Sequence, residues 1–399
     1  MNKIKKHIKQ FVRFIQSLFG FFKFQILESK KINNAEVVFI LPYFQTGGAE
    51  RVHLNIVKSV KDKKSCILFT HNSATDNFKE DFSQYSEIIE INKILSKNNN
   101  FINSLLKKHI AKTINNNQAL ISVFSSNTNF FYELLPLVKE HIITVDLIHA
   151  ISGENPILVN HYIASSHDIT NRVVINNKAY NDILLNYKKY KVDNECYNKV
   201  IIIENAIGID NNEKLNNRDG IKIGFVGRWS KEKRPEMFLK ISAEITKVDT
   251  SIKFVMAGIG MKSNIKMINE SGVSFLGEIT DDITLNQFYK SLTFVLITSF
   301  REGFPMVIPE AMAQGVIPIS TNVGGISEHI MSFENGILID DDDENEIVNQ
   351  FVDIIIKLIN DKELVSKLSL NAFNYSRKHF DIEAFNKKYR KTLLKELYS

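Results

Sequence analysis

The chain has 399 residues, of which 44% are apolar and 24% charged, a composition typical of a soluble globular protein with two domains. Its two cysteines, Cys66 and Cys196, which we expect in different domains, indicate a reducing compartment and no disulfide framework. Residues 1–31 carry a net charge of +7 and the remainder −2, so the basic character is local and argues against a nucleic-acid-binding face.

Residues 1–33 form a basic amphipathic segment. Its apolar residues recur at spacings of four and three, with the lysines off this seam: Ile4, Ile8, Phe11, Ile15, Leu18 and Phe22. Arg13 and Lys23 interrupt the run, which disfavours a transmembrane span, and there is no signal-peptide cleavage site. We expect a helix lying on the anionic inner face of the cell membrane, in a cytoplasmic protein. A helix packed on the protein itself or on another subunit is the alternative.

Apolar strands alternate with helical stretches through residues 34–205. The strands are expected at 35–44, 64–70, 87–92, 119–124, 141–147, 172–176 and 199–203. This alternation predicts a parallel sheet covered by helices on both faces. Gly47 and Gly48 follow the first strand and permit close backbone approach at a helix start. His149 follows the fifth strand, at the carboxyl edge of the predicted sheet.

A second domain is expected over residues 206–380, after a hinge near 205–218. Strand 221–226 leads into Gly227, Arg228 and Lys233, two cations that could converge on one diphosphate. Strand 252–257 precedes Gly258, but the following residues do not complete the dinucleotide fingerprint, which argues against an NAD enzyme.

The acidic run at 340–344 is interpreted as the N-cap of helix 346–359, with a metal site as the alternative. A terminal helix at 382–397, within a segment 381–399, is expected to return to the first domain.

The stretch 300–328 reads as strand end, loop, helix, strand and second glycine loop. Gly303 removes a side chain where backbone N–H groups can approach a ligand, and the following helix points its positive end there. Glu302 stands at the loop entrance, and Glu310 lies eight positions later, about two helical turns further along. The pattern predicts an anion site framed by two carboxylates.

This stretch resembles a known family. Glu302 and Glu310, separated by seven residues that include Gly303-Phe304-Pro305, are similar to the signature of retaining, nucleotide-sugar-dependent glycosyltransferases of group 1, family 4. The glycines at 315, 324 and 325 and the proline at 318 continue the likeness. The resemblance implies the α/β GT-B fold, two Rossmann-like parallel-sheet domains facing across a cleft.

The resemblance also implies roles. Arg228 and Lys233 would hold the donor diphosphate, and Glu302 would contact sugar hydroxyls as the third catalytic residue. The expected donor-binding residues are Gly47, Gly48, His149, Gly227, Gly258, Gly303, Phe304, Pro305 and Glu310, the last at the ribose. No cofactor and no metal are expected.

The implied function is transfer of a hexose or N-acetylhexosamine, from a UDP-sugar by preference, to a lipid-linked or polysaccharide acceptor in bacterial lipopolysaccharide or capsule synthesis. The loop at 152–155 is a candidate acceptor contact. An epimerase or phosphorylase on the same fold would need a base or a pyridoxal-binding lysine that we do not locate. A non-catalytic partner protein would be expected to lose Arg228, Lys233 or Glu302, and all three are present.

Overall fold

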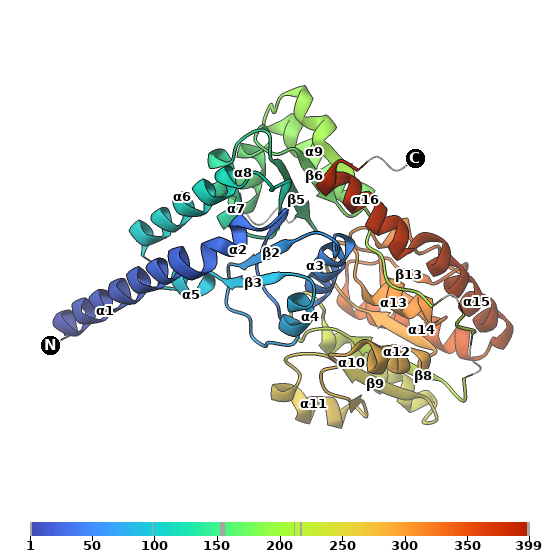
Figure 1. Ribbon diagram of the computed structural model, residues 1–399. Helices are drawn as coiled ribbons and strands as arrows, with labels where there is room; N and C mark the ends of the chain where they lie inside the picture. The colour runs from blue at the N-terminus through green and yellow to red at the C-terminus, as the bar shows by residue number, and fades with distance from the viewer. Residues whose placement is uncertain (1, 98, 152–155, 211, 216–217, 397–399) are drawn as a thin grey trace. The chain divides into compact units, whose positions relative to one another are not determined.

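The computed structural model describes residues 2–97, 99–151, 156–210, 212–215 and 218–396, with only the backbone for 2–4, 6–10 and 156–158. The candidate acceptor loop at 152–155 lies outside the described residues. The chain divides into two compact units, each built on its own parallel sheet (Figure 1). Unit 1 comprises Met1–Ile175, Ala179–Ile203 and Glu383–Ser399, and unit 2 comprises Asn176–Lys178 and Glu204–Ile382.

Unit 1 holds a seven-stranded sheet in the order β3-β2-β1-β4-β5-β6-β7, in which every pairing is parallel. The strands are β1 Val37–Leu41, β2 Ser65–Phe69, β3 Glu87–Glu90, β4 Ser122–Ser126, β5 Ile143–Ile148, β6 Asn171–Val174 and β7 Val200–Ile202. Most are buried along their whole length, which is why they appear as continuous apolar runs. Because all run parallel, their carboxyl ends meet at one edge.

The helices of unit 1 cover this sheet, and most of them share one apolar core with it. They are α1 Asn2–Lys23, the π-helix η1 Phe24–Glu28, α2 Ser29–Asn33, α3 Gly48–Ser59, α4 Lys79–Ser83, α5 Asn92–Leu95, α6 Asn100–Asn116, α7 Asn129–Leu134, α8 Pro156–Ala164, α9 Asn177–Lys189 and α16 Ile382–Leu394, with 3-10 turns η2 Leu135–Leu137 and η3 Asn194–Lys199. Both cysteines belong to unit 1, so the expectation of different domains is wrong. Cys196 lies in η3, directly before the last strand of this sheet.

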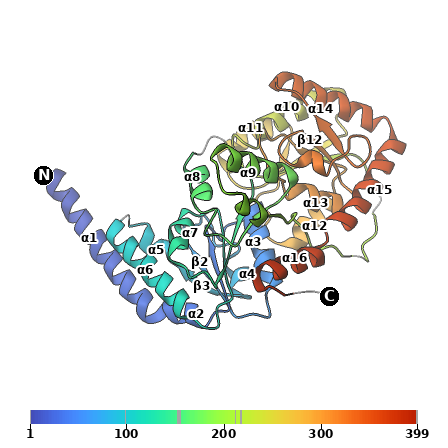
Figure 2. The same ribbon diagram turned by 90° about the horizontal axis from the view of Figure 1, so that it is seen from above.

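Helix α1 runs beside α5 and α6, and its first turns extend past them (Figures 1 and 2). Phe21 and Phe24 are buried in the core of unit 1, and Leu18 packs against it. The apolar row predicted from the sequence lies mostly on a different face of the helix from these buried residues, since Phe11 is 65% exposed and Phe22 is 50% exposed. Helix α1 therefore has two apolar faces, one packed and one open. Among the described residues no helix is both long and apolar enough to span a bilayer.

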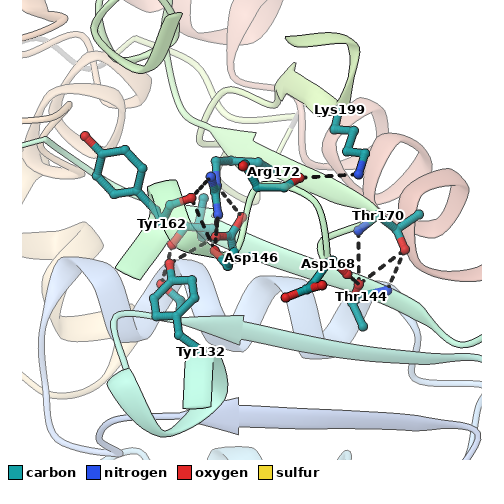
Figure 3. A network of polar contacts seen from close by, with 12 residues as sticks. Tyr132, Thr144, Asp146, Tyr162, Asp168, Thr170, Arg172 and Lys199 are labelled. Carbon is teal, nitrogen blue, oxygen red and sulfur yellow. Dashed lines mark hydrogen bonds and ion pairs between the residues drawn. The ribbon is translucent and has the colours of Figure 1, made fainter. Parts of the chain in front are cut away.

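A buried ion pair joins β5 to β6 inside unit 1 (Figure 3). The guanidinium of Arg172, 0% exposed, donates from Nε to both carboxylate oxygens of Asp146 at 3.1 and 3.0 Å, and from Nη2 to Oδ2 at 2.8 Å. Tyr132 donates its hydroxyl to the same carboxylate at 3.0 Å, and Arg172 also reaches the hydroxyl of Tyr187 at 2.5 Å. Burial raises the pKa of Tyr187 to about 12, so it stays a neutral phenol.

Unit 2 holds a six-stranded parallel sheet in the order β10-β9-β8-β11-β12-β13. The strands are β8 Lys222–Val226, β9 Lys253–Ala257, β10 Ser274–Phe275, β11 Phe294–Ile297, β12 Ile317–Thr321 and β13 Ile337–Ile339. The helices are α10 Pro235–Val248, α11 Ile265–Glu270, α12 Asp282–Lys290, α13 Val307–Ala313, α14 Glu344–Ile359 and α15 Lys362–His379, with 3-10 turns η4 Lys262–Asn264 and η5 Ile326–Glu328. Helices α10 and α14 lie side by side against this core (Figure 2).

The predicted class, two Rossmann-like parallel-sheet domains, is confirmed. The acidic run provides the helix cap that we expected, because the Asp343 carboxylate accepts from the backbone N–H groups of Asn345 and Glu346 at 2.9 and 3.0 Å. Strand β13 was not predicted, because its three residues are too short for a periodic signal.

Candidate functional site

Two neighbouring strands of unit 2 bring the predicted diphosphate and sugar residues together. Strand β8 pairs with β11, so the loop that follows β8 lies beside the loop that follows β11 at the carboxyl edge of the sheet. Lys233 belongs to the first loop and Glu302 to the second. Lys233 Nζ lies 2.5 Å from Glu302 Oε1, and Ser299 donates its hydroxyl to the same oxygen at 2.6 Å.

Exposure differs between the two partners of this ion pair. The side chain of Lys233 is 22% exposed and that of Glu302 is 9% exposed. Glu302 is therefore held in one position by two donors, whereas the ammonium still reaches solvent. An anion placed at this edge would share the lysine with Glu302.

Arg234 fixes the position of Lys233. Its backbone is left-handed, with φ of 46°, and its guanidinium donates to the carbonyls of Thr298 and Ser299 at 2.6 and 3.1 Å. Thr298 returns a hydrogen bond from its hydroxyl to the Lys233 carbonyl at 2.8 Å. Burial lowers the pKa of Arg234, and nearby Glu344 opposes that shift. Arg234 thus clamps the two loops together and is not itself offered to a ligand.

Two glycines allow loops at this edge to touch. A Cβ on Gly258, which has φ of +141°, would lie 1.8 Å from the Gly227 carbonyl oxygen. A Cβ on Gly324, with φ of +64°, would lie 2.0 Å from the Glu302 carbonyl oxygen. Gly227 and Gly258 were predicted for donor binding, and the structure adds a packing requirement, since only glycine fits at position 258.

In the loop at Gly303, Phe304 and Pro305, backbone groups rather than side chains are available to a ligand. The Gly303 carbonyl accepts from the side-chain amide of Asn176 at 3.0 Å and from the N–H of Gly325 at 2.8 Å. Phe304 is buried, with its ring 4.4 Å from that of His329, and Pro305 is buried too. Within the described part of the chain, the N–H groups of Gly303 and Phe304 donate to no other group. These two amides remain available to an anion.

Glu310 lies closer to the helix start than its spacing from Glu302 suggested. Helix α13 begins only at Val307 and has seven residues, so Glu310 is in its first turn. The expectation of two helical turns between the glutamates is wrong, because residues 303–306 form a loop. Tyr289 donates its hydroxyl to Glu310 Oε2 at 2.9 Å. Glu310 is thereby oriented from the neighbouring helix α12.

Arg228 differs from Lys233 and Arg234 of the same loop, which are both hydrogen-bonded. Its side chain is exposed, and no interaction ties it to another described residue. It follows Gly227 at the end of β8, in the same loop as Lys233. A guanidinium without a described partner, in the same loop as the paired ammonium of Lys233, leaves positive charge available to an anion at the carboxyl edge.

Comparison with known proteins shows which family the chain resembles. Residues 220–361 match the family model described as glycosyl transferases group 1. An uncharacterized glycosyltransferase of Methanocaldococcus jannaschii is 25% identical over 342 residues, 84% of this chain and 92% of the relative. The family model covers much of unit 2, and together with this relative it supports a glycosyltransferase of the group 1 type.

Other likenesses agree with this assignment. The capsular polysaccharide biosynthesis glycosyltransferase CapM of Staphylococcus aureus is 26% identical over 229 residues, 52% of this chain and 54% of CapM. The crystal structure of Anabaena HepE in complex with UDP-glucose superposes with a TM-score of 0.71 at 18% identity, covering 90% of this chain and 100% of HepE. The transferase therefore has the GT-B fold.

The predicted residues of unit 1 of the glycosyltransferase lie at the carboxyl edge of its own sheet. His149 directly follows β5, and Gly47 and Gly48 stand at the start of α3. The carboxylate of Glu50 occupies the space beside Gly47, since a Cβ there would lie 2.1 Å from Glu50 Oε2. Gly47, Gly48 and His149 therefore belong to unit 1, and the other nine predicted site residues belong to unit 2.

His149 has a partner that the sequence did not reveal. Its Nε2 lies 3.2 Å from Nε2 of His53, a fully buried residue of α3. Burial lowers the pKa of His149 to about 4 and holds that of His53 well below its usual range, with His149 adding to the latter shift. Both rings are therefore neutral near pH 7, and His149 serves as a neutral hydrogen-bonding group in the transferase.

Several residues that position the site were missed by sequence reasoning. They are His53, Asn176, Arg234, Tyr289 and Ser299. Arg234, which immediately precedes a proline at the helix start, had a local signal. Ser299 contacts Glu302 only three positions away, but a serine there is not distinctive. His53, Asn176 and Tyr289 act through contacts with segments more distant in the sequence and have no local signal.

Proposed function

We propose that this glycosyltransferase moves a hexose or N-acetylhexosamine from a UDP-sugar to a lipid-linked or polysaccharide acceptor, with retention of anomeric configuration and without a catalytic metal. The observation that carries the proposal is the cation group of unit 2. The loops at one carboxyl edge carry the exposed guanidinium of Arg228 and the ammonium of Lys233, which pairs with Glu302 but still reaches solvent. They also carry the backbone N–H groups of Gly303 and Phe304, which donate to no other described group. Such a group suits a diphosphate.

The charges indicate how the reaction proceeds. Cleavage of the sugar–phosphate bond places negative charge on the departing nucleoside diphosphate and positive charge on the anomeric carbon. Arg228 and Lys233 would stabilise the departing diphosphate, supplying charge that a metal supplies in other transferases. Glu302, held by Ser299, would accept hydrogen bonds from sugar hydroxyls. Glu310, oriented by Tyr289, would contact the ribose.

We infer the classes of donor and acceptor from proteins that this chain resembles. UDP-glucose is bound in the HepE structure, which shares the fold, and CapM is named for capsular polysaccharide biosynthesis.

To test the proposal, the purified chain is incubated with UDP-sugars and polyprenyl-diphosphate-linked saccharides. Nucleotide release gives the rate, and NMR of the product gives the anomeric configuration. We expect the donor's configuration and a rate unchanged by EDTA. An inverted product, or a rate lost in EDTA and restored by Mg²⁺, contradicts the proposal.

We also propose that the transferase binds the anionic inner face of the cell membrane through the open face of α1. Phe11, Phe19 and Ile26 on this face and its extension are 65%, 71% and 74% exposed, and exposed Arg13 and Lys23 flank it. Aromatic and aliphatic side chains would enter the acyl boundary while the cations meet lipid phosphates.

Point substitutions test this surface better than deletion does, because removing the segment would also remove the core residues Phe21 and Phe24. We expect Phe11→Ser/Phe19→Ser/Phe22→Ser to lower co-sedimentation with phosphatidylglycerol vesicles by about tenfold or more, given the apolar area that each ring buries. The control pair, Phe101→Ser/Leu185→Ser, replaces residues 64% and 65% exposed on other helices of unit 1. Equal pelleting of the triple variant and the unmodified chain would exclude this membrane contact.

A further inference from the structure

Four side chains that commonly hold metals gather at the amino edge of the unit 1 sheet. His167 precedes β6, and Asp193, Glu195 and Cys196 lie in and next to η3, which leads into β7. His167 Nδ1 lies 3.7 Å from Cys196 Sγ and 3.6 Å from Glu195 Oε1. One ligand atom from each of these three residues lies within 4.8 Å of the others.

The two separations from His167 Nδ1 fit one ion shared with Cys196 and Glu195. Tetrahedral Zn²⁺ with bonds of about 2.05 Å to nitrogen, 2.3 Å to sulfur and 2.1 Å to oxygen separates N from S by about 3.6 Å and N from O by about 3.4 Å. The distances of 3.7 and 3.6 Å are close to these values before any adjustment. A thiolate, an imidazole and a carboxylate together favour Zn²⁺ over Mg²⁺ or Ca²⁺.

Metal-bound histidines usually donate their other ring N–H to a carboxylate or carbonyl, and Asp193 is placed to accept from His167 in this way. Its Oδ2 lies 3.3 Å from Nε2 of His167, on the ring nitrogen that does not face the thiol. A carboxylate there holds the proton on Nε2 and leaves the lone pair of Nδ1 for a metal.

The segment that carries His167 is fixed on both sides (Figure 3). Lys199 donates from Nζ to the His167 carbonyl at 2.7 Å. The Thr144 hydroxyl donates to the Asp168 carbonyl at 3.2 Å, and the Thr170 N–H donates to the Thr144 hydroxyl at 3.0 Å. The backbone at the histidine is therefore positioned before any ligand arrives.

We propose that His167 Nδ1, Cys196 Sγ and Glu195 Oε1 bind Zn²⁺, with water as the fourth ligand. Binding converts the Cys196 thiol to a thiolate and releases its proton to solvent. The site stands at the amino edge of the sheet, whereas His149 and the glycine loop lie at the carboxyl edge. It is a structural site that joins the β6 and β7 ends of unit 1.

Without a metal, the same contacts place His167 between two carboxylates and the Cys196 thiol. His167, Asp193 and Glu195 have side chains 50%, 72% and 74% exposed, so such an ion-pair cluster would add little stability. The two alternatives differ in the state of the sulfur, because only a metal site converts the Cys196 thiol to a metal-bound thiolate.

The test uses the untagged full chain, stripped with chelator and titrated with Co²⁺. A thiolate-to-cobalt absorption band that saturates at one ion per chain, and is displaced by Zn²⁺, is the expected result. Cys196→Ser and His167→Ala should each remove the band. Cys66→Ala and His141→Ala, the other cysteine and an exposed histidine of unit 1, should keep it.

Glu195→Gln should weaken Co²⁺ binding about tenfold or more, whereas Glu140→Gln at another exposed position should leave it unchanged. No thiolate band in the unmodified chain, or a band that persists in His167→Ala, overturns the proposal. His167 is half exposed, so its alanine variant is expected to fold even if Cys196→Ser does not.

Discussion

Arg228→Ala and Lys233→Ala are each expected to lower the turnover of sugar transfer by about 100- to 1000-fold, the usual cost of removing one donor that stabilises transition-state charge. Arg228 is exposed and unpaired among the described residues, so its loss should leave the free energy of unfolding unchanged. Lys233→Ala also leaves Glu302 with Ser299 as its remaining partner in this group, so a small loss of stability accompanies the loss of turnover.

Lys231→Ala is the matched control, because Lys231 is an exposed cation of the same loop without a described partner. Its turnover should stay within about twofold of the unmodified chain. Initial rates at saturating donor, with urea unfolding measured in parallel, separate the two effects. Near-normal turnover in either Arg228→Ala or Lys233→Ala would contradict the diphosphate assignment.

Arg172→Met is expected to destabilise unit 1 by about 3–5 kcal/mol, because it leaves the buried Asp146 carboxylate without its cation. The guanidinium also supplies hydrogen bonds to the hydroxyls of Tyr187 and Ser165, which methionine cannot replace. Denaturant unfolding followed by circular dichroism measures the change, provided that the transition of unit 1 is resolved.

The double variant Arg172→Met/Asp146→Leu should recover much of that loss, since replacing both charges removes the unpaired carboxylate. Lys93→Met breaks an ion pair, 3.1 Å long, between a lysine side chain that is 69% exposed and Glu90. Because Glu90 keeps Lys79 as a partner, the cost should be at most about 1 kcal/mol. A cost of Arg172→Met no larger than that of Lys93→Met would show that the buried pair does not stabilise the fold as argued.

The sequence predicted the elements that depend on local pattern. Buried parallel strands such as β5 are continuous apolar runs, and a residue directly after such a strand must lie at the carboxyl edge. His149 and Gly227 could therefore be placed from the sequence. The cap of α14 by Asp343 is equally local.

Contacts that depend on strand order could not be predicted in this way. Lys233 meets Glu302 across 69 positions because β8 pairs with β11, which no spacing reveals. His53 was indistinguishable from any polar residue in an amphipathic helix until α3 was packed beside the end of β5. The two apolar faces of α1 also needed tertiary structure, because periodicity alone cannot say which face the core covers.

The most direct test of the central claim is a thermal-shift screen of the unmodified chain and Arg228→Ala with UDP, GDP, ADP and CMP. Each is measured with and without EDTA, against the same buffer without nucleotide. A ligand that binds only the folded state raises the melting temperature. We predict a rise with UDP that persists in EDTA and is reduced in Arg228→Ala. No rise with any nucleoside diphosphate, or a rise that EDTA abolishes, would contradict a metal-independent nucleotide-sugar site at this edge.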